Sequence, residues 1–377
     1  MVDSAWAEFW WNNVTGASMV VSNVINALRE RNIAVLSVPD DLPWRYQMRS
    51  AIEYNFRKSS SSENVFVQTI DAADECGNQE PGKFLLERYC KSRDIRMGYR
   101  ESSSKTIQQY LISNAVLHDT IIWVKGFLPD QIDTWIKFCK NYKSAGIADG
   151  MFLLEIRDCP QTNDTKSLTV VEFADWVSDY DVQLLNSFIL DRGQTYSAYW
   201  KRYISTLAAC LCKSDAEISA ELLDTTDFAN EDPLLGLQRI SDSDSYSSRG
   251  RDKKSGHVLA LLRQQRFEEL RKRIWNAQVQ VLFPLIELER VEFISRYSEE
   301  IQAALDQEEI RQYGEVLRKP EEVEIGTLQF LVKSWRISMP NADDRQRVDS
   351  LRQYRNTIAH MGCLTPAEIG NLLSKHL

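Results

Sequence analysis

The chain has 377 residues, of which 43% are hydrophobic, and a formal net charge of −9 at pH 7. This length and apolar content suit two or three domains with cores of their own. Residues 1–250 hold 25 Lys and Arg against 35 Asp and Glu, a net charge of −10, so residues 251–377 carry +1. An acidic first part argues against a broad surface that coats nucleic acid, but leaves room for a local site in the second part.

The sequence also predicts the compartment. No apolar run approaches the roughly 18 residues of a membrane span, and the first residues lack the basic and apolar regions of a secretory signal. The seven cysteines are scattered, and the one close pair, Cys210 and Cys212, has neither zinc-site spacing nor neighbouring histidines. We therefore expect a cytoplasmic protein with reduced thiols, no membrane contact, and no metal or other cofactor.

Up to residue 225, short apolar runs alternate with helical patterns. The runs that predict buried or half-buried strands span residues 33–38, 65–70, 120–124, 151–156 and 168–171. The patterns between them predict helices over residues 19–31, 45–57, 83–89, 106–117 and 129–140. This alternation indicates an α/β layer with a mainly parallel sheet. Further helical stretches from residue 181 to 223 are interpreted as a cap, which gives a first domain over residues 1–225.

The loop after the first predicted strand, residues 39–44, contains two aspartates, two prolines and no glycine. A P-loop NTPase has a glycine-rich loop here, whose N–H groups cradle phosphates. Carboxylates repel phosphate and proline has no N–H, and the strand at residues 120–124 lacks an acid to hold magnesium. The strand–helix order resembles AAA- or STAND-type P-loop ATPase domains. The resemblance implies a degenerate P-loop ATPase-like fold, and an unrelated α/β domain is the alternative.

Two other places in the first domain are candidates for binding a ligand. Residues 15–18, Thr-Gly-Ala-Ser, precede a predicted helix, whose N-terminus favours an anion. Glu155, Arg157 and Asp158 lie at the end of a predicted strand, at the edge where open α/β sheets bind ligands. Ordinary charged loop residues are the alternative at this second place.

Residues 226–256 are turn-rich and then polar and low in complexity, which predicts a flexible linker. Almost everything after it has a helical pattern, so residues 257–377 are predicted to form an all-α bundle. Pro284 should kink or split the long stretch at residues 258–297. The other predicted helices span residues 298–312, 326–335 and 342–361, and a last one starts at Thr365 with a capping-box pattern.

The most informative stretch lies in this bundle, at residues 355–360, Arg-Asn-Thr-Ile-Ala-His. Histidine changes charge near neutral pH, and arginine holds a phosphate through two parallel hydrogen bonds. Helical spacing places Arg355 close to the apolar stripe, where it needs a bound anion or a carboxylate partner such as Glu287 or Glu289. Gly362 predicts the end of the helix just after His360.

This stretch resembles the HEPN superfamily (higher eukaryotes and prokaryotes nucleotide-binding), compact helical bundles marked by an Arg-x4–6-His motif. Arg355 matches the arginine, Asn356 the polar residue that commonly follows it, and His360 the histidine. Active members are metal-independent ribonucleases, usually paired so that two motifs face each other. The resemblance implies that Arg355, Asn356 and His360 are catalytic, that RNA is the substrate, and that the chain forms a homodimer through residues 257–377.

The resemblance further implies an RNA-cutting effector in prokaryotic stress or anti-phage defence, with the first domain available to a partner protein. The alternative is a catalytically inactive scaffold or regulatory protein that binds partner proteins or nucleotide, because some members of the superfamily have lost catalysis. His118, His257 and His376 are isolated in the sequence, so a histidine metal cluster is not expected.

Overall fold

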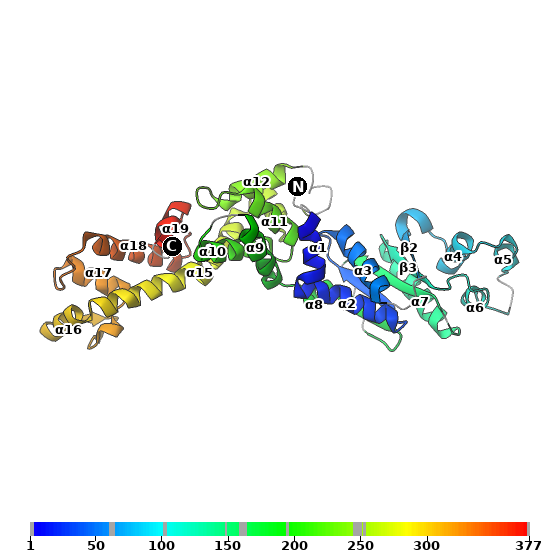
Figure 1. The fold of residues 1–377 in the computed structure, drawn as a ribbon, viewed down its shortest axis with the longest axis horizontal. Helices are drawn as coiled ribbons and strands as arrows, with labels where there is room; N and C mark the ends of the chain where they lie inside the picture. The colour runs from blue at the N-terminus through cyan, green and yellow to red at the C-terminus, as the bar shows by residue number, and fades with distance from the viewer. Residues whose placement is uncertain are drawn as a thin grey trace. The chain divides into compact units, whose positions relative to one another are not determined.

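The computed structural model describes residues 4–59, 65–100, 104–147, 149–157, 164–193, 196–243, 251 and 254–374. The chain divides into two compact units, Met1–Asp181 and Val182–Leu377, and each has its own hydrophobic core (Figure 1). The sequence predicts the end of the first domain at residue 225, whereas this division falls at residue 181. The difference arises because helices between these positions bury residues such as Ile204 and Ile218 in the core of the second unit.

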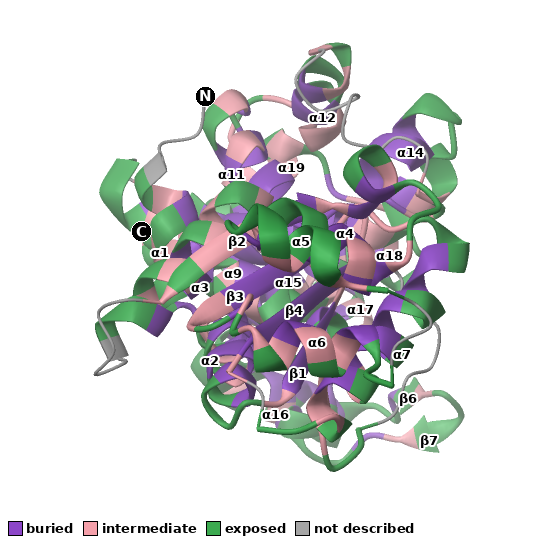
Figure 2. Ribbon diagram, turned by 90° about the vertical axis from the view of Figure 1, so that its right-hand side faces the viewer, coloured by how far each residue is buried: buried purple, intermediate pink, exposed green. Residues whose placement is uncertain are grey.

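The first unit is built on a five-stranded parallel sheet with the strand order β2-β3-β4-β1-β5. The strands are β1 (Ile33–Val38), β2 (Phe66–Asp71), β3 (Thr120–Lys125), β4 (Met151–Arg157) and β5 (Leu168–Glu172). They coincide with the five apolar runs of the sequence, so the predicted parallel α/β layer is confirmed. Strands β1 and β4 are almost fully buried, as expected of central strands in a parallel sheet, and Figure 2 draws both largely in purple.

Helices in two groups cover this sheet. The first group consists of α1 (Ser4–Asn13), α2 (Thr15–Arg29), α3 (Arg45–Ser59) and α8 (Phe173–Trp176). The second consists of α4 (Pro81–Tyr89), α6 (Ile107–Ser113) and α7 (Pro129–Ser144), whose side chains share a core with alternate strand residues such as Val35 and Leu154. A π-helix, η1 (Ala72–Cys76), follows β2, and the exposed α5 (Arg93–Gly98) buries no residue.

In the residues that the structure describes, the second unit is mainly helical, so the predicted helical region is confirmed. Its first helices are α9 (Asp179–Gly193), which begins in the first unit, α10 (Ala198–Cys212), α11 (Ala216–Thr225), α12 (Pro233–Asp242) and α14 (Val258–Arg263). The remaining helices are α15 (Phe267–Arg296), α16 (Ser298–Gln307), α17 (Ile325–Lys333), α18 (Ala342–Ala359) and α19 (Pro366–Leu373). One core extends through all of them from Leu190 to Leu373.

The stretch predicted as a flexible linker, residues 226–256, contains the helix α12. Asp232 caps this helix by accepting a hydrogen bond from the amide of Leu234, and Pro233 occupies its first turn. The Asp-Pro pair that suggests a turn is therefore a helix start. Leu237 and Ile240 bury α12 in the core of the second unit. Residues 244–250, 252 and 253 of the predicted linker lie outside the described residues.

The long stretch at residues 258–297 is divided at residues 264–266, between α14 and α15, and α15 continues through Pro284, so a split at Pro284 is not found. Pro284 is exposed, while Leu282, Leu285 and Ile286 beside it are buried. Their packing offsets the hydrogen bond that a proline removes from a helix.

The region expected to be helical at residues 298–312 ends earlier, at Gln307. It is followed by an antiparallel hairpin of β6 (Arg311–Gln312) and β7 (Glu315–Val316) and by a short 3-10 helix, η2 (Pro320–Glu322). The hairpin turns at Tyr313 and Gly314, which both have positive φ angles, of 53° and 89°.

Candidate functional site

The sheet of the first unit has a natural place for a ligand at the carboxyl ends of β1 and β4. The connection from β1 runs to β2 at one edge of the sheet, and the connection from β4 runs to β5 at the opposite edge. Open α/β sheets bind ligands in the crevice outside the carboxyl ends of their strands, near a change in the direction of the connections. The loop that lacks the phosphate-binding glycines, residues 39–44, starts at this point.

Charged side chains of the protein itself fill this crevice. Glu155 is 2% exposed near the end of β4, and its carboxylate accepts hydrogen bonds from Arg45 at 3.0 Å and from Arg49 at 2.8 and 3.0 Å. The indole of Trp123 donates a further hydrogen bond to it at 3.1 Å. Burial lowers the pKa of the Arg45 guanidinium, and the adjacent Glu155 opposes this change. The two cations are thus neutralised in part by a fixed carboxylate that would repel phosphate.

The loop itself is tied to this cluster. Arg45 donates a hydrogen bond to the carbonyl oxygen of Pro39 at 3.0 Å, and Arg157 pairs with Asp40 at 3.5 Å. Of the three strand-end residues that the sequence suggests as a ligand site, Glu155 and Arg157 therefore contact the protein itself. Asp158 lies outside the described residues.

The helix start at residues 15–18 is also taken by a carboxylate of the protein. The amide of Gly16 donates a hydrogen bond to Asp181 at 2.9 Å. A Cβ atom at residue 16 would lie 2.4 Å from the backbone oxygen of Trp176, so glycine is needed for close packing. The expectation of a site for an external anion at this helix start is therefore wrong, because Asp181 occupies it.

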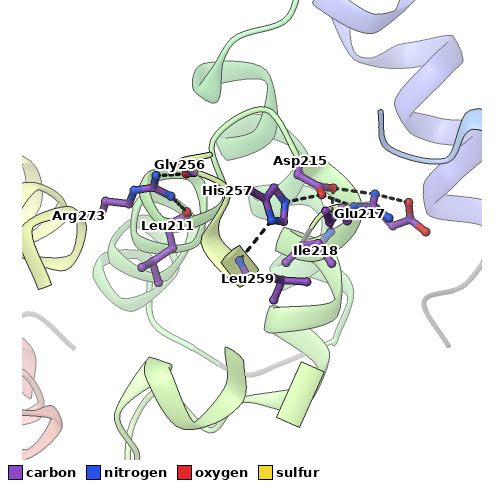
Figure 3. A network of polar contacts seen from close by, with 9 residues as sticks. Leu211, Asp215, Glu217, Ile218, Gly256, His257, Leu259 and Arg273 are labelled. Atoms are coloured by element: carbon purple, nitrogen blue, oxygen red, sulfur yellow. Dashed lines mark hydrogen bonds and ion pairs between the residues drawn. The ribbon is translucent and has the colours of Figure 1, made fainter. Parts of the chain in front are cut away.

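In the second unit, a buried polar network joins the start of α11 to the start of α14 (Figure 3). Arg251 is 1% exposed and pairs with Asp215 at 2.6 Å and with Glu217 at 2.7 Å. His257 approaches the same carboxylate of Asp215 at 3.1 Å through Nε2, and its Nδ1 accepts the amide of Leu259. That acceptor role assigns the ring proton to Nε2, which donates to Asp215.

The network fixes the segment before α14 to the bundle. Burial works to raise the pKa of the Asp215 carboxyl, but Arg251 and His257 outweigh it and hold the pKa at about 2. Arg273 adds a second anchor by donating hydrogen bonds to the carbonyl oxygens of Leu211 and Gly256. His257 is therefore not isolated, and its side chain is 2% exposed, which makes it a structural residue without access to a substrate.

The motif at residues 355–360 lies at the end of α18. Arg355 and Asn356 are half-buried on its last turns, and His360 is the exposed residue that follows Ala359 and caps the helix. The amide of His360 donates to the carbonyl oxygen of Asn356 at 3.0 Å. Within the described part of the chain, no hydrogen bond or ion pair joins the side chains of Arg355 and His360, and the exposed imidazole has no hydrogen-bond partner. The imidazole of His360 is therefore open to solvent.

The end of α18 is set by an unexpected residue. Met361 has a φ of 61°, and the amide of Gly362 donates to the carbonyl oxygen of Thr357 at 2.8 Å. A Cβ atom at residue 362 would come within 2.9 Å of the Thr357 side chain. Gly362 therefore permits a close approach, and the left-handed backbone that ends the helix belongs to Met361.

Arg355 has a carboxylate partner, but neither of the two that the sequence suggests. Its guanidinium lies 3.7 Å from Glu324, the residue that precedes α17, and the two side chains are 30% and 40% exposed. Glu324 also accepts a hydrogen bond from the hydroxyl of Tyr313 at 2.8 Å. Glu287 pairs instead with Arg290 at 2.7 Å, and Glu289 with Arg347.

The sequence did not predict that Tyr313 and Glu324 lie beside Arg355. A Tyr-Gly pair is a weak hairpin signal compared with Asn-Gly or Asp-Gly, and each strand of the hairpin is only two residues long. The one available signal was Gly314 between polar residues.

Metal clusters, membrane helices and cavities do not extend the site around Arg355 and His360. In the described ranges, no cluster of three His, Cys, Asp or Glu is arranged to hold a metal ion. The same ranges contain no helix with the length and apolar character needed to cross a membrane. A cavity of about 640 Å³ in the first unit is lined in part by Phe66 and His118, and His118 pairs with Asp119 and Asp149.

Comparisons with known proteins do not assign the chain to a family. No model of a protein family matches the sequence, and no curated protein matches it. Among solved structures, it is similar to a chain from the structure of Drosophila ORC bound to poly(dA/dT) DNA and Cdc6. The identity is 10% and the TM-score 0.28, over 99% of this chain and 67% of that chain. A likeness of this level identifies neither a fold nor a function.

Proposed function

We propose that the chain is a metal-independent endoribonuclease in which Arg355, Asn356 and His360 act on a phosphodiester of RNA. The observation that carries the proposal is the exposure of His360 at the end of α18, with a half-buried Arg355 one and a half turns before it. General acid–base catalysis needs an imidazole that a substrate can reach, and this imidazole is open to solvent. The resemblance of residues 355–360 to the HEPN motif supports the same assignment.

The chemistry needs only groups that the chain and RNA supply. The 2′-oxygen of a ribose attacks the adjacent phosphorus, so a 2′-O–P bond forms and the P–O5′ bond breaks. His360 takes the proton of the 2′-hydroxyl or gives a proton to the leaving 5′-oxygen, and Arg355 stabilises negative charge on the phosphate. The products are a 2′,3′-cyclic phosphate and a 5′-hydroxyl end.

Two copies of the chain suit this reaction better than one. Five residues along an ideal helix separate two side chains by about 140° and about 7.5 Å, so Arg355 and His360 of one chain point apart. A second copy would bring another histidine to the same phosphate, so that one histidine acts as base and the other as acid. We therefore propose a homodimer formed through the second unit.

Cleavage of mixed single-stranded RNAs in EDTA tests the proposal directly. The chain should release fragments with 2′,3′-cyclic phosphate ends, while Arg355→Ala and His360→Ala should lower the rate by about 10²-fold or more. Matched controls are Arg296→Ala and His118→Ala, because the side chains of Arg296 and His118 are about half exposed and each pairs with a carboxylate outside the motif. Equal cleavage by His360→Ala and the unaltered chain would exclude this site.

A second candidate is a non-enzymatic scaffold or regulatory protein, which the filled crevice of the first unit favours. Glu155 occupies the place of a ligand there, with Arg45 and Arg49 bound to it. In this view the unit keeps an α/β layer for binding a partner protein without phosphate chemistry. Thermal unfolding with millimolar ATP or GTP separates this view from nucleotide regulation, because a bound nucleotide would raise the Tm.

A further inference from the structure

The hairpin β6–β7 is held in a fixed place beside the first turn of α17. The side-chain oxygen of Gln312 accepts hydrogen bonds from the amide of Glu324 at 3.0 Å and from the hydroxyl of Thr327 at 2.6 Å. Its amide nitrogen donates to the carbonyl oxygen of Glu322 at 3.1 Å. These three contacts satisfy polar groups at and just before the start of α17, and they tie the hairpin to that helix.

The ring of Tyr313 projects from this tip next to Arg355. Its hydroxyl donates to Glu324 at 2.8 Å, and Glu324 lies 3.7 Å from the guanidinium of Arg355. The residue is nevertheless 81% exposed. One end of the ring is therefore anchored, while its aromatic faces remain open to solvent.

The backbone of Tyr313 is unfavourable for this residue type. A two-residue turn with positive φ at both positions favours Asn, Asp or Gly, and only Gly314 follows this preference. A bulky residue with a positive φ is an outlier that surrounding structure must maintain. The hydroxyl contact with Glu324 holds the residue in this conformation and leaves the exposed faces of the ring available to a ligand.

We propose that Tyr313 stacks on one base of a single-stranded RNA whose neighbouring phosphate binds Arg355. Every base has a π-face, so an open ring beside a cation suits a nucleotide without a required sequence. Bases of a duplex are already stacked on one another, which restricts the site to unpaired RNA. The inference rests on the proposed function, since it places the substrate of the same Arg355.

Binding in an inactive background tests this site apart from catalysis. Fluorescence anisotropy of a labelled single-stranded RNA is measured with His360→Ala alone and with Tyr313→Asn, Tyr313→Phe or Tyr46→Ala added. Tyr313→Asn should weaken binding about tenfold, and Tyr313→Phe, which keeps the ring, should retain most of the affinity. Tyr46 is 74% exposed on α3 in the first unit, so its loss should have no effect.

Asparagine is chosen because it tolerates a left-handed backbone, so Tyr313→Asn should unfold at the same temperature as its parent or a higher one. An oligonucleotide of abasic ribose phosphates serves as the second probe, and on it Tyr313→Asn should bind as tightly as its parent. Unchanged affinity for normal RNA, or an equal loss on the abasic probe, would overturn the stacking role.

This binding experiment and the cleavage assay together separate the inference from the proposed function. Binding that depends on Tyr313, together with an absence of cleavage by the unaltered chain, would keep the RNA site and reject the ribonuclease. Cleavage that depends on His360 but not on Tyr313 would support the ribonuclease and reject the stacking role of Tyr313.

Discussion

Two arginines on the same helix, Arg347 and Arg355, have opposite surroundings. Arg347 is 12% exposed and binds the fully buried Glu289 through two of its nitrogens, one of them at 2.8 Å. It also donates to the carbonyl oxygens of Asn371 and Leu372 at the end of α19, at 2.7 and 2.8 Å. Arg355 has one carboxylate contact, at 3.7 Å, with a half-exposed Glu324.

The difference separates an arginine that holds the bundle together from one that is free to act on a ligand. All hydrogen-bonding directions of a guanidinium can be used internally only when carboxylate and carbonyl groups surround it, as at Arg347. A long, solvent-screened pair such as Arg355–Glu324 contributes little to stability and is easily exchanged for a phosphate. Spacing in the sequence does not distinguish the two cases.

The sharpest test of the comparison is Arg355→Ala. We expect RNA cleavage to fall by about 10²-fold to 10⁴-fold, while the free energy of unfolding changes by less than about 1 kcal/mol. Cleavage rates and urea unfolding of the same preparation give both quantities. A loss of stability as large as the one expected for Arg347→Ala would remove the distinction between the two arginines.

Arg347→Ala should lower the free energy of unfolding by about 3–5 kcal/mol, because it removes the guanidinium that pairs with the buried carboxylate of Glu289. Urea unfolding measures this effect, with Arg296→Ala as the control for an exposed pair. A double variant, Arg347→Leu with Glu289→Leu, should recover most of the loss. A small effect of Arg347→Ala would mean that water reaches Glu289.

The buried pair Arg251–Asp215 extends the comparison to pH. Its carboxyl has a pKa of about 2 in the folded chain, below the ordinary 3.8, so the folded state favours the charged form. The resulting stability, about 2 kcal/mol, is complete above pH ~4 and is lost as the pH falls from ~4 toward ~2. Urea unfolding at several pH values should show a weaker acid dependence in Asp215→Asn than in the unaltered chain. An identical pH dependence in Asp215→Asn and in the unaltered chain would contradict a lowered pKa of Asp215.

The smallest expected effect is that of Glu324→Gln, which removes the carboxylate beside Arg355. RNA affinity should rise a few-fold, roughly 0.5 kcal/mol, because one charge that repels phosphate is gone. Anisotropy in the His360→Ala background measures it, with Glu309→Gln as a matched change at an exposed Arg–Glu pair. Weaker binding in Glu324→Gln would show that this carboxylate orders the site.

The sheet of the first unit was predictable, because buried parallel strands form continuous apolar runs such as residues 33–38 and 151–156. The absence of glycine from residues 39–44 was also visible in the sequence. What fills the crevice was not predictable, because Arg45 and Glu155 are 110 residues apart and meet only in the folded sheet.

The candidate site was predictable only along one helix. The pattern around Arg355 gave a helix that ends near His360, and α18 does end at Ala359. Tyr313 and Glu324 lie between the helices predicted at residues 298–312 and 326–335, where the sequence predicts no element, so neither residue could be placed. Likewise, the division at residue 181 depends on the packing of α10 and α11, which a local pattern does not contain.

The cluster of Glu155, Arg45 and Arg49 also limits how the first unit can change by substitution. Replacing Glu155 alone leaves two arginines that repel each other, and replacing either arginine weakens the compensation of a buried carboxylate. The effects of these substitutions are therefore coupled, so the free-energy change of a double substitution will differ from the sum of the two single changes.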